Sequence, residues 1–119
     1  MSKHDPRVSL RQIDDYARQA QSICAGRTLR DLLADRQALL AFERALEILG
    51  EAVKRLPTEL RDRYPAVPWK LVAGMRDHLS HGYDEVRHDV LWNAVQQDVP
   101  TLLATVEQMI RELDTPAEQ

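Results

Sequence analysis

The residues best suited to chemistry lie together in the segment GMRDHLSHGYDEV, residues 74–86. Arg76, His81 and Tyr83 fall within eight positions of a chain that has only four histidines and three tyrosines. A guanidinium can hold a phosphate through two hydrogen bonds, and an imidazole can transfer a proton near neutral pH. Phosphoryl transfer from RNA would use these groups, and this chemistry requires no metal.

The spacing of these residues predicts that they lie at the end of a helix. Arg76 and Ser80 are four residues apart and share one helical face, whereas His81 and Tyr83 follow where Gly82 favours a C-terminal cap. The negative end of a helix dipole does not attract a phosphate, so Arg76 has to supply the positive charge. The same dipole stabilises a protonated His81, which suits a general acid.

Two simpler interpretations stay open on spacing alone. An arginine, a histidine and a tyrosine at a polar helix end are common on solvated surfaces. A metal site formed by His78, His81 and His88 is less favoured, because no His-Glu-x-x-His or Glu-x-x-His pattern accompanies them. Cys24 lies far away in the sequence. We therefore expect neither a metal nor another cofactor.

Four amphipathic helices are expected to position this segment. Apolar residues recur at steps of three and four in residues 7–25, 36–55 and 68–82. A short segment with a capping-box-like start, TLRDLLAD, covers 28–35, and the proline-rich stretch 56–68 predicts a connection with one helical turn. A fourth helix should begin near Glu85 and kink or break at Pro100, which cannot donate a hydrogen bond to Gln96. The expected fold class is an all-α, up-and-down four-helix bundle.

Length and composition indicate one globular domain. The 119 residues, of which 44% are hydrophobic, suffice for one core. We expect a single domain over 1–119 with frayed ends at 1–6 and 114–119. The sequence contains neither an apolar run of membrane-spanning length nor the apolar core of a signal peptide, so a cytoplasmic location is expected. The net charge of −3 does not suit a general nucleic-acid coat, so any RNA contact requires a local group of cations.

The pattern Arg76-x4-His81-x-Tyr83 resembles the signature of HEPN domains. Its surroundings are similar to the HepT-like branch, the toxins of HepT–MntA toxin–antitoxin pairs. The similarity extends over ALEILGEAVKRLPTELRDRYPAVPWKLVAGMRDHLSHGYDEV and VLWNAVQQDVPTLL, about residues 45–103. The resemblance implies a homodimer whose two motifs face a shared cleft. It also implies a metal-independent endoribonuclease in which the 2′-hydroxyl of RNA attacks the adjacent phosphate.

The resemblance also implies a role for each motif residue. His81 would transfer the proton, and Arg76 would bind the phosphate and stabilise the transition state. Tyr83 would accept AMP from ATP through a cognate MntA-like minimal nucleotidyltransferase, the antitoxin of a type VII-like system. A bulky anionic adduct on Tyr83 would occupy the phosphate site and repel RNA. The residues expected to support the site are Asp77, His78 and Ser80.

Asp77 stands where many HEPN proteins have asparagine. Its carboxylate could weaken anion binding, orient Arg76 or hydrogen-bond His81, and these alternatives stay open. Two other functions are also compatible with the sequence. One is a non-catalytic helical binding or substrate subunit of a minimal nucleotidyltransferase, and the other is a degenerate bundle with a structural role. The RNA target, transfer or messenger, and the number of AMP groups are likewise open.

Overall fold

A computed structural model describes residues 5–80 and 86–115 of the chain. His81 and Tyr83 therefore lie outside the described residues, as do most of the two chain ends expected to fray. The described residues form seven α-helices and no strand, which confirms the all-α class. The helices are α1 (Pro6–Cys24), α2 (Leu29–Ala34), α3 (Arg36–Lys54), α4 (Thr58–Asp62), α5 (Trp69–Ser80), α6 (His88–Gln97) and α7 (Val99–Asp114).

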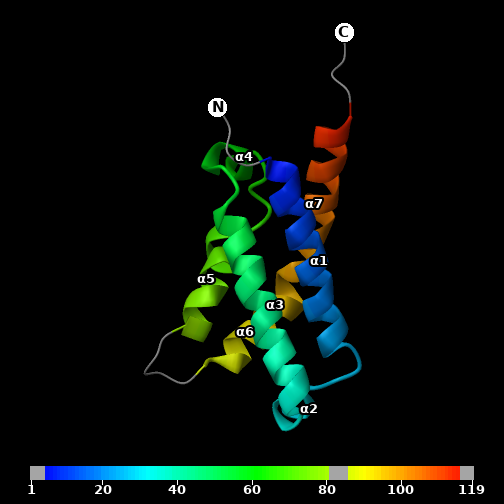
Figure 1. Ribbon diagram of the computed structural model, residues 1–119, viewed down its shortest axis with the longest axis vertical. Helices are drawn as coiled ribbons and strands as arrows, with labels where there is room; N and C mark the ends of the chain where they lie inside the picture. The colour runs from blue at the N-terminus through cyan, green and yellow to red at the C-terminus, as the bar shows by residue number, and fades with distance from the viewer. Residues whose placement is uncertain (1–4, 81–85, 116–119) are drawn as a thin grey trace.

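The long helices alternate in direction, as Figure 1 shows. Helix α1 runs away from the N-terminal end of the bundle, α3 returns, α5 runs down again, and α6 and α7 together return to the C-terminus. Helix α1 packs against α3 and α7, and α3 packs against α5. The short helices α2 and α4 lie at opposite ends of the bundle, where they join the long ones (Figure 1). No helix among the described residues is long and apolar enough to cross a membrane.

The fourth helix of the bundle is broken beside Pro100, as expected. Helix α6 ends at Gln97 and α7 begins at Val99. Asp98 belongs to both ends, because its N–H donates to the Ala94 carbonyl (2.8 Å) and its carbonyl accepts from the Leu102 N–H (3.0 Å). Pro100 falls in the first turn of α7, where a missing N–H leaves no helical hydrogen bond unmade.

The start of α6 differs from the expectation of a helix beginning near Glu85. The helix begins at His88, with Arg87 as an N-cap residue that makes no side-chain capping bond. The His88 N–H donates to the Val86 carbonyl (3.0 Å), so residues 86–88 form a tight turn in place of a first helical turn. Arg87 and Asp89 are also joined by an ion pair at 3.1 Å, which holds this turn together.

Capping side chains explain where the earlier helices begin. The Asp5 carboxylate accepts from the Arg7 N–H at 3.0 Å, and the Asp35 carboxylate accepts from the Ala38 N–H at 3.1 Å. Thr28 and Asp31 form the reciprocal capping box expected from TLRDLLAD. Each such cap stabilises its helix by about 1 kcal/mol. Local sequence thus fixes these starts, and tertiary packing only has to orient the helices.

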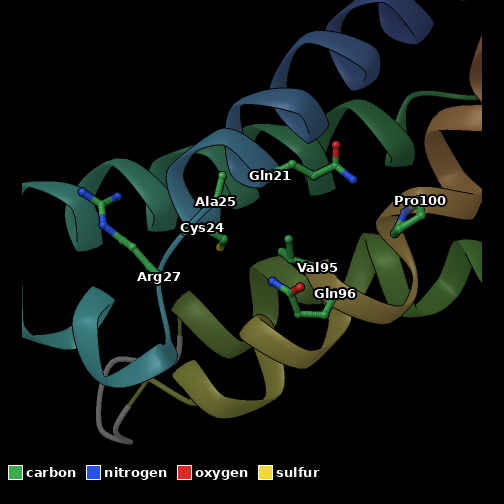
Figure 2. Close-up of a pocket in the computed structure, with 8 residues that line it drawn as sticks. Gln21, Cys24, Ala25, Arg27, Val95, Gln96 and Pro100 are labelled. Carbon is green, nitrogen blue, oxygen red and sulfur yellow. The ribbon is translucent and has the colours of Figure 1, made fainter.

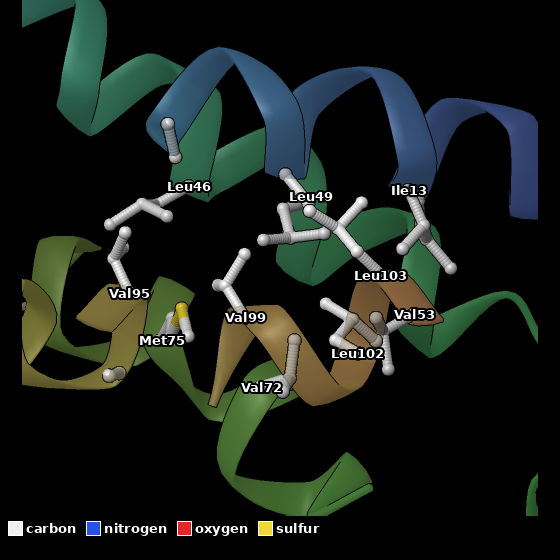
Figure 3. Packing of buried hydrophobic residues seen from close by; sticks show 14 of the residues in the cluster. Ile13, Leu46, Leu49, Val53, Val72, Met75, Val95, Val99, Leu102 and Leu103 are labelled. Atoms are coloured by element: carbon white, nitrogen blue, oxygen red, sulfur yellow. The ribbon is translucent and has the colours of Figure 1, made fainter. Parts of the chain in front are cut away.

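The core lies between the apolar faces of the long helices. Figure 3 shows Leu46 and Leu49 of α3 close to Val99 of α7 and Met75 of α5. These four side chains are fully buried or nearly so, and burying each one stabilises the fold by about 1.5–3 kcal/mol. The aligned apolar faces hold α5 against α3, and this contact positions the candidate site.

Both tryptophans belong to the core, as expected. Trp69 is 8% exposed at the start of α5, and its indole N–H donates to the Tyr64 carbonyl at 3.0 Å. Trp92 is half-buried against the same core, and so is Tyr64. The start of α5 is therefore tied to the connection that precedes it.

Candidate active site at the end of α5

Arg76 lies near the end of α5 and reaches toward α3. Its Nη1 atom is 2.6 Å from the Oε2 atom of Glu51, and the two side chains are 39% and 35% exposed. Both charges are thus partly withdrawn from water, which strengthens their attraction relative to a fully exposed pair. The motif arginine is held by a carboxylate on the neighbouring helix.

Gly50, the residue before Glu51, explains how α5 comes so close to α3. A Cβ atom at this position would lie 3.2 Å from the Ala73 carbonyl oxygen and 3.4 Å from the Arg76 Cβ. Any larger side chain would push the two backbones apart. Because Gly50 has no side chain, the Cβ atom of Arg76 can lie against α3. The Arg76 guanidinium then lies beside Glu51, the residue that follows Gly50.

The hydrogen-bonding capacity of Arg76 is only partly used. A guanidinium has five N–H donors, and Nη1 is the nitrogen that faces Glu51. The Nε atom is buried and has no hydrogen-bond partner among the described residues. Because the side chain is partly exposed, an anion can approach the guanidinium from the solvent side, where one negative charge, that of Glu51, is already in contact with it.

Asp77 and His78, two of the expected supporting residues, follow Arg76 directly on α5 and therefore face other directions than Arg76 does. Asp77 is exposed, and the carboxylate that contacts Arg76 is Glu51. His78 borders a hollow of about 320 Å³ between α5 and α6, with Met75 and Leu91 among its lining residues. Ser80 is the last residue of α5. The structure thus separates His78 from Arg76, and His81 and Tyr83 lie outside the described residues.

Three glutamates follow one face of α3 at intervals of four residues, and each has an arginine or histidine side chain beside it. The pairs are Glu43 with His88 (2.6 Å), Glu47 with Arg44 (3.0 Å) and Glu51 with Arg76 (2.6 Å). The four-residue spacing was visible in the sequence, but it does not reveal which glutamate contacts the site.

The pairs at the two ends of this row connect α3 to both flanks of residues 81–85. Arg76 of α5 precedes that segment and contacts Glu51, and His88 of α6 follows it and contacts Glu43. Arg76 of α5 and His88 of α6 are therefore both paired with glutamates on the same face of α3.

Other candidate chemical groups lie apart from Arg76. Cys24 borders a hollow of about 300 Å³ at the end of α1, and Figure 2 shows it opposite Val95 and Gln96 of α6. Burial raises the pKa of the Cys24 thiol to about 11, so little of it is the reactive thiolate at neutral pH. Over residues 5–80 and 86–115, no three His, Cys, Asp or Glu side chains are grouped as metal ligands would be.

The chain is similar to several curated proteins along most of its length. A protein from Caldanaerobacter subterraneus subsp. tengcongensis is 41% identical over 72% of this chain and 77% of its own. One from Methanocaldococcus jannaschii is 33% identical over 96% and 94% of the two chains. Both are provisionally named as RNases. A third, from Thermococcus cleftensis, is 38% identical over 82% of each chain and is provisionally named ribonuclease HepT.

No solved structure is significantly similar to the chain. The family model described as "Ribonuclease HepT-like" matches residues 13–109, a range that includes Arg76, the Glu51 contact and the whole motif. Family members are RNA-cleaving enzymes by this description. The chain therefore belongs to the HepT-like ribonuclease family.

Proposed function

We propose that the protein is a metal-independent endoribonuclease whose active site consists of Arg76 and His81. One observation carries this proposal: in a chain of this ribonuclease family, Arg76 lies at a helix–helix contact with its side chain 39% exposed to solvent. A guanidinium so placed can bind a phosphate of RNA and stabilise the charge that builds up on it during cleavage.

The proposed reaction is an internal transfer of the phosphoryl group. The 2′-hydroxyl oxygen attacks the adjacent phosphorus and its proton passes to water, while the bond from phosphorus to the 5′-oxygen breaks. His81, protonated, donates a proton to the leaving 5′-oxygen, as a general acid does. The products carry a 2′,3′-cyclic phosphate and a 5′-hydroxyl. Arg76 neutralises the extra charge on the phosphate oxygens in the transition state.

A homodimer would help an acidic protein to bind RNA. The net charge is −3, and Arg76 already has a carboxylate beside it. Two copies of the motif that face one cleft would double the local positive charge and leave the acidic exterior unchanged. We therefore propose that the active species is a dimer, with the RNA phosphates between the two motifs.

We further propose that the protein is the toxin of a toxin–antitoxin pair and is silenced at Tyr83. An MntA-like minimal nucleotidyltransferase would transfer AMP from ATP to the Tyr83 hydroxyl and release pyrophosphate. The bound adenylate would place a negative charge two residues from His81, where it would pair with Arg76 and exclude RNA.

Cleavage of RNA by the purified protein, freed of any antitoxin and kept in EDTA, tests the proposed function. We expect products with 2′,3′-cyclic phosphate ends, and loss of cleavage in Arg76→Ala and His81→Ala. Arg44→Ala is a matched control, because this arginine is also paired with a glutamate of α3 but lies on that helix itself. Equal cleavage by wild type and His81→Ala would refute the mechanism.

Modification at Tyr83 is tested separately, by mass spectrometry after incubation with the nucleotidyltransferase and ATP. We expect an AMP-sized increase in mass that is absent in Tyr83→Phe. The increase should be present in the control Tyr16→Phe, which removes the hydroxyl of a partly buried tyrosine of α1, outside the motif. An adduct that persists in Tyr83→Phe would show that the modified residue lies elsewhere.

A second function is favoured by the neutralisation of Arg76 by Glu51. A guanidinium already paired with a carboxylate attracts phosphate less strongly, which suits a non-catalytic subunit that presents Tyr83 to the nucleotidyltransferase. Expression in cells separates the two functions. Growth arrest by wild type but not by His81→Ala supports the ribonuclease, and absence of arrest by either supports the binding subunit.

A further inference from the structure

We propose that Glu51 is a positioning residue for the reaction: it holds the Arg76 guanidinium in the orientation that meets the scissile phosphate. The proposal rests on the proposed function, because it assigns a role in the same site. Glu51 does not touch the RNA in this arrangement and acts only through Arg76.

The first support is the contact itself. Nη1 of Arg76 and Oε2 of Glu51 are 2.6 Å apart, with each side chain roughly two-thirds buried. An unrestrained arginine samples many rotamers, and each must be given up when it binds a phosphate. A carboxylate that selects one rotamer beforehand removes that loss from the catalytic step.

The second support is that the backbone brings these two residues together. Gly50 permits a close approach of α5, with its Cα facing the Ala73 carbonyl and the Arg76 Cβ. Glu51 follows Gly50 on α3. The close contact at Gly50 therefore positions both the Cβ atom of Arg76 and the neighbouring Glu51 carboxylate. The position of the guanidinium is thus determined at both ends of the side chain.

The third support is selectivity within the row of glutamates on α3. Glu47 pairs with Arg44 of its own helix, and Glu43 pairs with His88 of α6. Among the described residues, Glu51 is the one carboxylate that contacts Arg76. If the glutamates served only to make this face of α3 negative, no particular one of them would have to contact Arg76.

Removal of the Glu51 charge should have two opposite effects, and their combination identifies the role. A carboxylate beside the guanidinium competes with the RNA phosphate, so its loss should leave KM unchanged or lower it. Loss of orientation should lower kcat, since misplaced catalytic groups are poor at stabilising a transition state. A merely structural residue would not produce this split.

Steady-state cleavage by Glu51→Gln and Glu47→Gln provides the test. The control is closely matched, because Glu47 lies one turn away on α3, is 38% exposed and also pairs with an arginine. We expect kcat to fall by about 10–100-fold in Glu51→Gln, as for a catalytic group displaced by about 1 Å, with KM not raised. Glu47→Gln should stay close to wild type. A kcat of wild-type size in Glu51→Gln, or an equal loss in both variants, would overturn the proposal.

A double-mutant cycle tests whether the effect passes through Arg76. In the Arg76→Lys background, Glu51→Gln should change the residual rate much less than in the wild-type background, because the side chain that it orients is gone. A full further loss would show that Glu51 acts by another route. If Glu51→Gln does not fold, Glu51→Asp replaces it, and a wild-type kcat in that shortened variant overturns the proposal.

An observation that needs no cleavage separates this proposal from the proposed function. The Nε–H signal of Arg76 in an NMR spectrum, identified by its loss in Arg76→Lys, should be sharp in wild type and broadened or shifted in Glu51→Gln. Absence of RNA cleavage by wild type would contradict the proposed function alone. An unchanged Nε–H signal in Glu51→Gln would contradict the positioning role alone.

Discussion

Replacement of Gly50 by alanine tests the close contact of α3 with α5 on which the site depends. Within a helix, alanine is favoured over glycine by about 0.8–1 kcal/mol. Here the new Cβ would lie 3.2 Å from the Ala73 oxygen and 3.4 Å from the Arg76 Cβ. Overpacking of this kind typically costs about 1–3 kcal/mol. The net effect should be a loss of about 0–2 kcal/mol in the free energy of unfolding.

Gly74 of α5 provides a matched control, since it also lies inside a helix. A Cβ built on Gly74 has no heavy atom within 4 Å apart from its own helix backbone and chain neighbours. Gly74→Ala should therefore stabilise the protein by about 0.8–1 kcal/mol. Urea unfolding of the two variants measures the difference, which should be about 1–3 kcal/mol. Because urea slopes are about 1–3 kcal/mol per molar, the midpoints should be clearly separated.

Activity should follow the same contact. The base of Arg76 moves when α5 is displaced, so Gly50→Ala should lower kcat for RNA cleavage while Gly74→Ala retains it. The contradicting result is a gain of stability in Gly50→Ala as large as that in Gly74→Ala. Such a result would mean that the space beside Gly50 is not occupied by α5.

Two further predictions concern groups outside the site. The Tyr64 hydroxyl donates to the Glu112 carboxylate and, as the largest cause, lowers the pKa of Glu112 below its usual 4.5; the resulting stability is present above that pH and is lost as pH falls through the lowered pKa. The melting temperature of Tyr64→Phe should therefore lie below that of wild type at neutral pH and converge with it as the pH falls through the lowered pKa of Glu112, and a gap that stays constant with pH would contradict this. Burial raises the pKa of Cys24 from 9.0 to about 11, so alkylation by iodoacetamide at pH 8 should be roughly 100-fold slower than for an ordinary thiol and become fast in denaturant. Rapid labelling of the folded protein would show that Cys24 is accessible.

Local sequence signals were enough to predict most of the helices. The steps of three and four in residues 7–25 and 36–55 correspond to α1 and α3 to within one residue at each end. The Thr28–Asp31 capping box and the break beside Pro100 were also confirmed. These features depend on residues close together in the chain, so their physics is contained in a short segment of sequence.

The partner of Arg76 could not be predicted in this way. The motif predicts Arg76 as a site residue and offers Asp77 as a carboxylate that could orient it, but the carboxylate in contact with Arg76 is that of Glu51. Nothing in the spacing of Glu43, Glu47 and Glu51 distinguishes them, because all three share one face of α3. The choice depends on how far α5 is displaced along α3, which is a property of tertiary packing. The roles of His81 and Tyr83 remain predictions.

The contact at Gly50 also selects one alignment of α5 among several that charge alone would accept. Movement of α5 along α3 by four residues, about 6 Å, would bring Arg76 to Glu47. Glu47 also carries a carboxylate, although it is already paired with Arg44. The shift would bring the Ala73 backbone against residue 46, one turn before Gly50 on the same face of α3, and this residue is a leucine with a full side chain. The missing Cβ of Gly50 thus favours one alignment of α5 along α3. Without it, the equally spaced glutamates of α3 would allow several alternative alignments.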